Sequence, residues 1–151
     1  MPAFEDVENF PSNEDNLNQF PTGEWAGIVF TGVEPSKTFD DWIRPISERM
    51  SWWTKRKQMK RDKSRDRNWI INTNWALYVD NYLEGFHIPF VHSDLNSVLD
   101  YGDYTTELFE GGVLQIGVAS KGEPFFEIPE GSPDYGKKIA AYYWWLFPGL
   151  M

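Results

Sequence analysis

Residues 74–92 read NWALYVDNYLEGFHIPFVH, and this stretch holds the only two histidines of the chain, His87 and His92. Apolar residues recur in it at the spacing of a helix, and Asn74 is a residue type that caps helix beginnings. The pattern predicts a helix that begins at Asn74 and runs to about His87.

Two carboxylates share one side of this predicted helix with a histidine. Each residue advances a helix by about 100°, so Asp80, Glu84 and His87 fall together, away from the centre of the apolar stripe. For the two carboxylates, an ordinary solvated helix face is an equally good interpretation.

His92 cannot join this face on a continuous helix, because it would lie about 140° round from His87. Pro89 supplies the predicted break, since proline disfavours helix at the residue before it and lacks a backbone donor. With the helix ended there, the chain can turn and bring His92 back towards His87. Two converging imidazoles favour a metal site, and the alternative is a pair of ordinary surface or core histidines.

The composition is that of a folded domain. The chain has 151 residues, of which 41% are hydrophobic and 25% charged, and it is rich in aromatic residues. It contains no cysteine, which excludes disulfides, thiolate zinc sites, cysteine nucleophiles and an iron–sulfur cluster held by these residues. We expect a cytoplasmic location. No apolar run approaches the roughly 18–20 residues that span a bilayer, so no membrane segment is predicted.

Charge is distributed unevenly. The net charge is −9, yet residues 55–67 contain eight basic residues against Asp62 and Asp66. The remaining, acidic part of the chain argues against nucleic-acid binding, which depends on clustered basic charge. The basic run is interpreted as a solvated linker or helix face, and the alternative is a docking site for an acidic electron-transfer partner.

The rest of the chain mixes strand and helix patterns. Thr38 can cap a helix, which Pro45 would weaken or kink, and a loop rich in Gly and Pro spans residues 121–136. The last predicted strand is apolar on both faces, as a strand covered on both sides would be. The stretches typical of strands are 25–31, 69–72, 105–108, 113–118 and 139–147, of which the third and fourth flank a turn and indicate a hairpin.

The stretch 74–92 resembles the signature that opens the catalytic domain of Rieske oxygenase α subunits. This family includes aromatic-ring-hydroxylating dioxygenases and choline-monooxygenase-like enzymes. Its pattern is Asn-Trp, a few residues, acid-Asn, and then acid-x-x-His-x-x-x-x-His, and the chain agrees in residue type and spacing. Residues 23–30 resemble the end of the family's Rieske domain, and residues 146–151 a strand in the middle of its catalytic domain. The chain would then be an internal piece of an α subunit.

The resemblance implies a role for each polar residue of the signature. His87 and His92 would be ligands of a mononuclear Fe(II) held by two histidines and one carboxylate. Glu84 would match the acid that links this iron to the Rieske centre of a neighbouring subunit. Asp80 and Asn81 would lie behind the iron ligands and support them without binding the iron.

The implied fold class is α+β, with a partial helix-grip catalytic domain in which an antiparallel sheet grips a long helix. Residues 1–36 would be the C-terminal remnant of a Rieske-type domain, and residues 37–68 a connecting helix and basic linker. Residues 69–151 would be the first half of the iron-binding catalytic domain.

Two parts of the family's machinery are missing. The motifs that hold the Rieske 2Fe–2S cluster need cysteine, and the chain has none. The third iron ligand, an aspartate, normally comes far downstream, and Asp94, Asp100 and Asp103 lie too early to match it. We therefore predict that the chain alone hydroxylates nothing.

The implied function of the full-length protein is O2-dependent hydroxylation of an aromatic or small organic substrate. It would need mononuclear Fe(II), a Rieske 2Fe–2S cluster, and a ferredoxin or reductase as electron donor, commonly in a homotrimer. Two alternatives stay open. One is a non-catalytic module of the same fold that binds an apolar ligand, and the other is a truncated gene product with no independent function.

Overall fold

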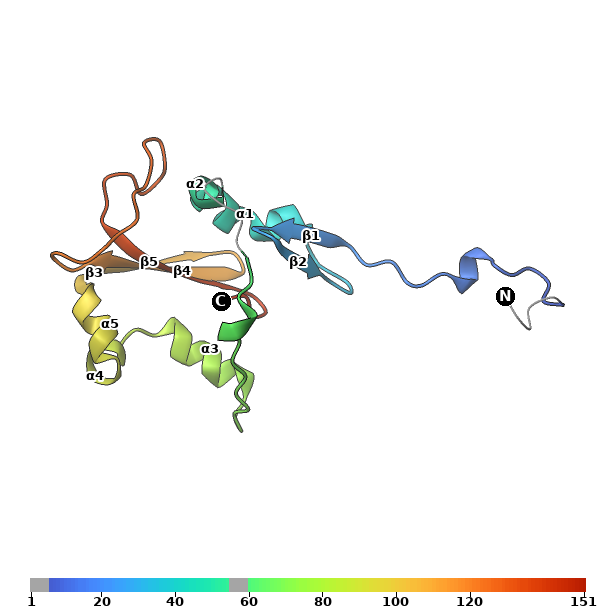
Figure 1. The fold of residues 1–151 in the computed structure, drawn as a ribbon, viewed down its shortest axis with the longest axis horizontal. Coiled ribbons are helices and arrows are strands. Elements are labelled where there is room, and N and C mark those ends of the chain that lie inside the picture. The colour runs from blue at the N-terminus through green and yellow to red at the C-terminus, as the bar shows by residue number, and fades with distance from the viewer. Residues whose placement is uncertain (1–5, 55–59) are drawn as a thin grey trace.

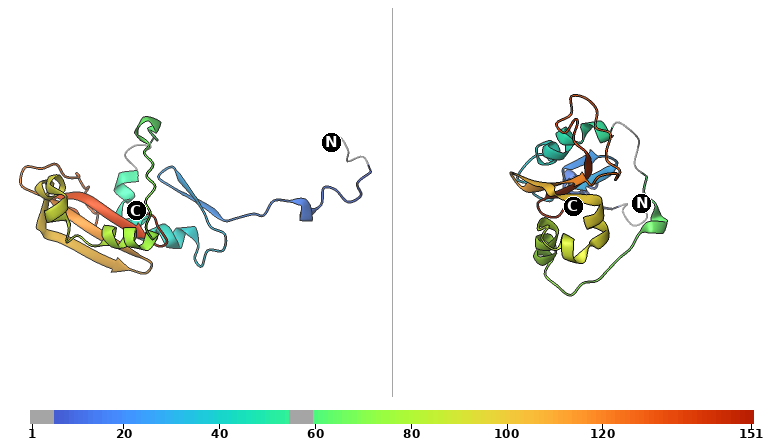
Figure 2. Two further views of the ribbon diagram at one scale, coloured as in Figure 1. Left: turned by 90° about the horizontal axis from the view of Figure 1, so that it is seen from below. Right: turned by 90° about the vertical axis from the view of Figure 1, so that its left-hand side faces the viewer.

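A three-stranded antiparallel sheet is the centre of the structure, with helices on both of its faces (Figures 1 and 2). The computed structural model describes residues 6–54 and 60–151. The strand order is β3 (Leu99–Phe109), β4 (Gly112–Ala119) and β5 (Ile139–Leu146). The fold is therefore a mixed α+β arrangement, as predicted from the sequence.

The helices divide into two groups. On one face lie α1 (Phe39–Arg49) and α2 (Ser51–Thr54), and on the other lies the succession of α3, α4 and α5 (Figure 1). The bounds of the second group are Trp75–Leu83, Ile88–Val91 and Ser93–Val98. A separate two-stranded sheet, β1 (Thr22–Trp25) with β2 (Ile28–Thr31), stands beside α1. Short 3-10 turns occur at Asn13–Asp15 and Lys63–Arg65.

The hydrophobic core lies between the sheet and α1. Side chains alternate along a strand, so Leu114 and Ile116 of β4 face α1 while Gln115 between them faces α3. Leu114 and Ile116 pack with Ile43 and Ile46, the two buried residues of α1. The α3 face is covered less completely. Its exposed large apolar side chains are Trp75, Leu77, Tyr78, Phe86, Phe90 and Val91.

Helix α1 forms where the sequence predicts it. Thr38 caps the helix by accepting a hydrogen bond from the backbone N–H of Asp41, and acidic residues occupy the first turn, where the helix dipole favours them. Pro45 lies inside the helix, which nevertheless continues to Arg49. The packing of its buried face against the sheet outweighs the hydrogen bond that proline cannot donate.

A buried carboxylate ties the loop after β4 to the rest of the fold. Asp134 is only 1% exposed, and it accepts hydrogen bonds from Nη2 of Arg49 at 2.9 Å, from Nζ of Lys137 at 2.9 Å and from the hydroxyl of Tyr142 at 2.8 Å. Burial alone would raise the pKa of Asp134, but the hydrogen bonds from Arg49, Lys137 and Tyr142 outweigh it and lower that pKa below its ordinary value. Asp134 therefore joins α1, the loop and β5.

The predicted hairpin and last strand are confirmed. Strands β3 and β4 pair with Thr105 opposite Ile116, and β4 pairs with β5 with Ile116 opposite Tyr142. β3 begins earlier than predicted, at Leu99, with a register shift between Asp100 and Thr105. The predicted loop at 121–136 contains no helix or strand.

Two strand predictions are wrong. The expected strand at 25–31 is a hairpin, because Ala26 and Gly27 adopt positive φ and turn the chain back. The expected strand at 69–72 is irregular, and Ile70 is fully exposed. A strand needs a neighbour for its N–H and C=O groups, and in the part of the chain that is described no segment pairs with 69–72. Residues 55–59 of the basic run lie outside the described residues, and 60–67 are exposed.

Candidate metal site

Helix α3 begins as predicted and ends earlier than predicted. The side chain of Asn74 caps it by accepting from the backbone N–H of Ala76 at 2.9 Å. The helix stops at Leu83 instead of continuing to His87, and Glu84 takes extended backbone angles. The carboxylate of Glu84 accepts hydrogen bonds from the backbone N–H groups of Phe86 at 2.8 Å and His87 at 3.3 Å. These N–H groups are no longer free to extend the helix, so a local side-chain turn replaces it.

Pro89 does not break the helix, which is a second correction. It lies in the first turn of the four-residue helix α4, Ile88–Val91. Proline is well tolerated there, because the N–H groups of the first turn have no partner within the helix. His87 precedes this helix and His92 follows it, so one turn of helix separates the two histidines.

The two imidazole rings lie close together, as the sequence predicts. The ring centroids of His87 and His92 are 5.0 Å apart, and the ring planes are inclined at 71°. The His87 side chain is 23% exposed, whereas His92 is exposed. His87 and His92 flank the single turn of α4, so the short segment between them keeps the two rings close.

One ring nitrogen of His87 has a carboxylate partner. Nδ1 of His87 is hydrogen-bonded to Oε1 of Glu84. Desolvation would raise the pKa of Glu84, but the hydrogen bonds from the His87 ring and the Phe86 N–H outweigh it and lower that pKa. With Nδ1 carrying the proton, Nε2 of His87 keeps a lone pair and is free to bind a metal.

This donor set fits part of a transition-metal site. Imidazole nitrogens suit Fe(II), and a carboxylate behind one of them orients that ligand. Within residues 6–54 and 60–151 there is no group of three or more His, Cys, Asp or Glu residues that could hold a metal. His87 and His92 are the candidate ligands at this turn, and with Glu84 they do not form such a group.

Asp80 and Asn81 are placed differently from the predicted shared face. Both are exposed on α3. The backbone carbonyl of Asp80 accepts the N–H of Glu84 at 3.1 Å. Because α3 ends before Glu84, the predicted continuous face of Asp80, Glu84 and His87 does not form.

A tyrosine cluster beside this turn was missed in the sequence. Ring centroids are 6.5 Å apart for Tyr82 and Tyr143, 6.4 Å for Tyr104 and Tyr143, and 5.9 Å for Tyr101 and Tyr104. Burial, together with the nearby Tyr143, raises the pKa of Tyr82 to about 12. Tyr104 of this cluster donates its hydroxyl hydrogen to Gln115, and Tyr143 lies opposite Gln115 on β5. Gln115 is the only polar side chain of β4. A lone glutamine in an apolar strand was the available signal.

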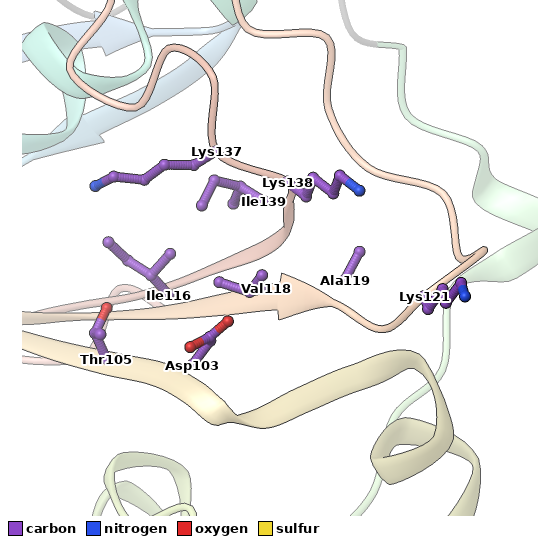
Figure 3. Close-up of a pocket in the computed structure, with 9 residues that line it drawn as sticks. All are labelled: Asp103, Thr105, Ile116, Val118, Ala119, Lys121, Lys137, Lys138 and Ile139. Carbon is purple, nitrogen blue, oxygen red and sulfur yellow. The ribbon is translucent and has the colours of Figure 1, made fainter.

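The cavity drawn in Figure 3 is a separate feature. Its volume is about 550 Å³. Ile116 and Ile139 in its wall also belong to the core on the α1 side, so the cavity does not contain the histidines. The remaining lining residues are Asp103, Thr105, Val118, Ala119, Lys121, Lys137 and Lys138 (Figure 3).

Comparison with known proteins establishes the family. Residues 48–151 match the family described as the ring hydroxylating alpha subunit (catalytic domain). The chain belongs to this family, as the signature around the two histidines predicted.

Curated relatives come from plants and bacteria. The chain is 41% identical over 64 residues to the chloroplastic choline monooxygenase of Arabidopsis thaliana, which covers 40% of this chain and 15% of that protein. It is 27% identical over 150 residues to the carnitine monooxygenase oxygenase subunit of Escherichia coli (strain K12), covering 97% of this chain and 38% of that protein. The chain is 23% identical over 151 residues to the chloroplastic choline monooxygenase of Beta vulgaris, covering 96% of this chain and 32% of that protein.

The chain thus spans well under half the length of these relatives. No solved structure gives a match. Among the described residues, no helix has both the length and the apolar character to cross a membrane.

Proposed function

We propose that this chain is part of the terminal oxygenase component of a Rieske-type enzyme and supplies two ligands, His87 and His92, to a mononuclear Fe(II). The observation that carries the proposal is the approach of the two imidazole rings to 5.0 Å, with the Nδ1 of His87 hydrogen-bonded to Glu84. Membership of the ring-hydroxylating family supports it.

Each residue of the site has a proposed task. Glu84 holds the Nδ1 proton of His87, which fixes the tautomer and directs Nε2 towards the metal. Glu84 is also the proposed link to the Rieske centre of a neighbouring subunit. Asp80 and Asn81 are proposed to support the ligands from outside. When bound, Fe(II) supplies the one-electron chemistry that activation of O2 requires.

The finer fold assignment follows the family. We propose that residues 69–151 are the first half of a helix-grip domain, in which β3, β4 and β5 belong to the sheet and α3 to the helix that it grips. Residues 1–36 are proposed as the end of a Rieske-type domain and residues 37–68 as the connection. The third iron ligand and the 2Fe–2S cluster are assigned to parts of the whole protein outside residues 1–151.

The proposed reaction is O2-dependent hydroxylation of an aromatic or small organic substrate, with a ferredoxin or reductase as electron donor and a homotrimer as the assembly. The relatives are named for choline and carnitine, so a small organic cation is the substrate class that we favour. Tyrosine faces attract such cations, and four tyrosines gather beside the histidine turn. A cytoplasmic location belongs to the same proposal.

Metal binding tests the site in the 151-residue chain itself. Co(II) is a suitable probe, because it is paramagnetic and takes the same imidazole ligands as Fe(II). In a chain with only two histidines, the two imidazole signals are readily followed by NMR. We expect Co(II) to broaden both signals at the same concentration, and each of His87→Ala and His92→Ala to weaken binding.

A matched control and the opposing outcomes are clear. Asn96→Ala changes a polar residue of α5 that lies outside the proposed ligand set, and it should bind Co(II) as the parent does. Broadening of only one imidazole, or binding that survives both histidine substitutions, would contradict a shared site. If iron is also absent from the whole protein, a non-catalytic apolar-ligand module becomes the better interpretation. The isolated chain should show no hydroxylation with an electron donor and O2.

A further inference from the structure

Gln115 is a buried polar residue that the proposed chemistry does not use. Its side chain is 1% exposed, and it is one of the two buried polar or charged residues among those described. The rest of β4 is apolar or glycine. Burying a primary amide is costly unless its donors and acceptor form hydrogen bonds, so the partners of the Gln115 side chain are informative.

The first contact of Gln115 is with the end of helix α3. Its Nε2 donates to the backbone carbonyl of Tyr82 at 2.9 Å. The last four carbonyls of a helix have no partner within it, and Tyr82 is the penultimate residue of α3. The amide therefore satisfies one of these carbonyls and attaches the helix end to the sheet, two residues before Glu84.

The second contact leads to the other side of Glu84. Oε1 of Gln115 accepts the hydroxyl hydrogen of Tyr104 at 2.8 Å. The Tyr104 ring lies near Gly85, close enough that a Cβ added to Gly85 would be 3.7 Å from Cε1 of Tyr104. One side chain thus connects to the residues on either side of Glu84, by a direct bond to Tyr82 and through Tyr104 to Gly85.

We propose that Gln115 is a positioning residue of the metal site, which holds the backbone on both sides of Glu84 and so sets the direction in which His87 presents Nε2. The part of this proposal that concerns metal rests on the proposed function. In this role Gln115 acts through Tyr82, Tyr104 and the turn that Glu84 forms, and not by contact with His87 or His92.

Three variants of the full 151-residue chain separate positioning from general stability. Gln115→Met keeps the length of the side chain and removes both hydrogen bonds. Tyr104→Phe removes only the hydroxyl that donates a hydrogen bond to Oε1 of Gln115. Ile116→Val, at the neighbouring position on the opposite face of β4, is the matched control for a small loss of core packing.

Two measurements are needed, Co(II) affinity from the NMR titration of the two imidazoles and amide hydrogen exchange. For Gln115→Met we expect about tenfold weaker Co(II) binding. We also expect exchange at Glu84, Ile88 and His92 to rise about tenfold more than exchange in β4 and β5, because the loss is local. Tyr104→Phe should show the same pattern at smaller size. Ile116→Val should leave Co(II) affinity unchanged.

The possible results are distinguishable. A parent chain that does not bind Co(II) contradicts the proposed metal site. A parent that binds, together with a Gln115→Met variant that binds equally well and exchanges no faster at Glu84, contradicts only the positioning role. If Gln115→Met does not fold, Tyr104→Phe decides the question, because it leaves the amide and its bond to Tyr82 in place. In that case an unchanged affinity and unchanged exchange count against the proposal.

Discussion

Nδ1 of His87 and Oε1 of Glu84 are joined by a hydrogen bond across three residues. The other oxygen of the same carboxylate accepts the N–H of Phe86 at 2.8 Å. One side chain therefore performs two structural tasks: it replaces the next turn of α3 and it orients the imidazole. A change at Glu84 should affect both.

Replacement of Glu84 by alanine should weaken metal binding strongly. The variant loses the acceptor for Nδ1 of His87, and such supporting carboxylates typically contribute 10–100-fold to metal affinity. Glu84→Gln retains an oxygen that can accept the same hydrogen bond but loses the charge, so its effect should be smaller. Calorimetry on the 151-residue chain should therefore show Co(II) affinity falling in the order parent, Glu84→Gln, Glu84→Ala.

The control for charge is Glu130→Gln, an exposed carboxylate in the loop between β4 and β5. It removes the same charge and should leave Co(II) affinity unchanged. Equal affinities for the parent and Glu84→Ala would show that the carboxylate does not support the ligand.

Loss of the buried carboxylate at Asp134 should destabilise the fold. Asp134→Ala leaves Arg49 without its buried partner and the Tyr142 hydroxyl without its acceptor. Arg49 keeps its bidentate pair with Glu107, so the variant loses buried hydrogen bonds without isolating a charge, which should cost about 1–3 kcal/mol. Urea unfolding followed by tryptophan fluorescence measures this difference in the free energy of unfolding. Asp94→Asn, an exposed carboxylate on α5, should differ from the parent by less than about 0.5 kcal/mol.

The contribution of Asp134 should also depend on pH. Its pKa in the folded chain is lowered, because the hydrogen bonds from Arg49, Lys137 and Tyr142 outweigh the desolvation that acts in the opposite direction. The unfolded chain therefore binds this proton more readily, and the stabilisation is complete above the unfolded pKa of about 3.9. It is lost as the pH falls through the lower folded pKa. The gap in unfolding free energy between parent and Asp134→Asn should be largest near pH 6 and shrink below pH 4. If the difference in unfolding free energy stays constant over this pH range, the charge of the Asp134 carboxylate does not contribute to stability.

Local signals in the sequence were sufficient for several elements. The cap at Thr38 and the acidic first turn predict α1, and the turn between β3 and β4 predicts their hairpin. The approach of His87 to His92 was also predicted, but for the wrong reason. Proline was expected to end the helix, whereas the carboxylate of Glu84 ends it earlier and Pro89 begins a new turn.

Contacts between distant segments could not be predicted in this way. Residues 69–72 have the composition of a strand, yet pairing depends on a neighbour that composition does not reveal, and none of the described residues supplies it. The bond from Gln115 to Tyr82 spans 33 positions, and that from Arg49 to Asp134 spans 85. Only the isolation of Gln115 in an apolar strand hinted at such a contact.

Replacement of Gly112 by alanine should destabilise the sheet. Gly112 begins β4 opposite Leu146, and a Cβ there would lie 2.6 Å from the backbone carbonyl oxygen of Trp145 and would also overlap the ring of Phe109. Because the backbone of Trp145 cannot move aside as a flexible side chain can, the overlap should lower the free energy of unfolding by about 1–3 kcal/mol. Urea unfolding measures this difference. Gly149→Ala is the matched control, since a Cβ at Gly149 meets nothing within 4 Å and its φ is not positive. If the two variants unfold at the same urea concentration, β4 and β5 do not approach each other at Gly112 as described.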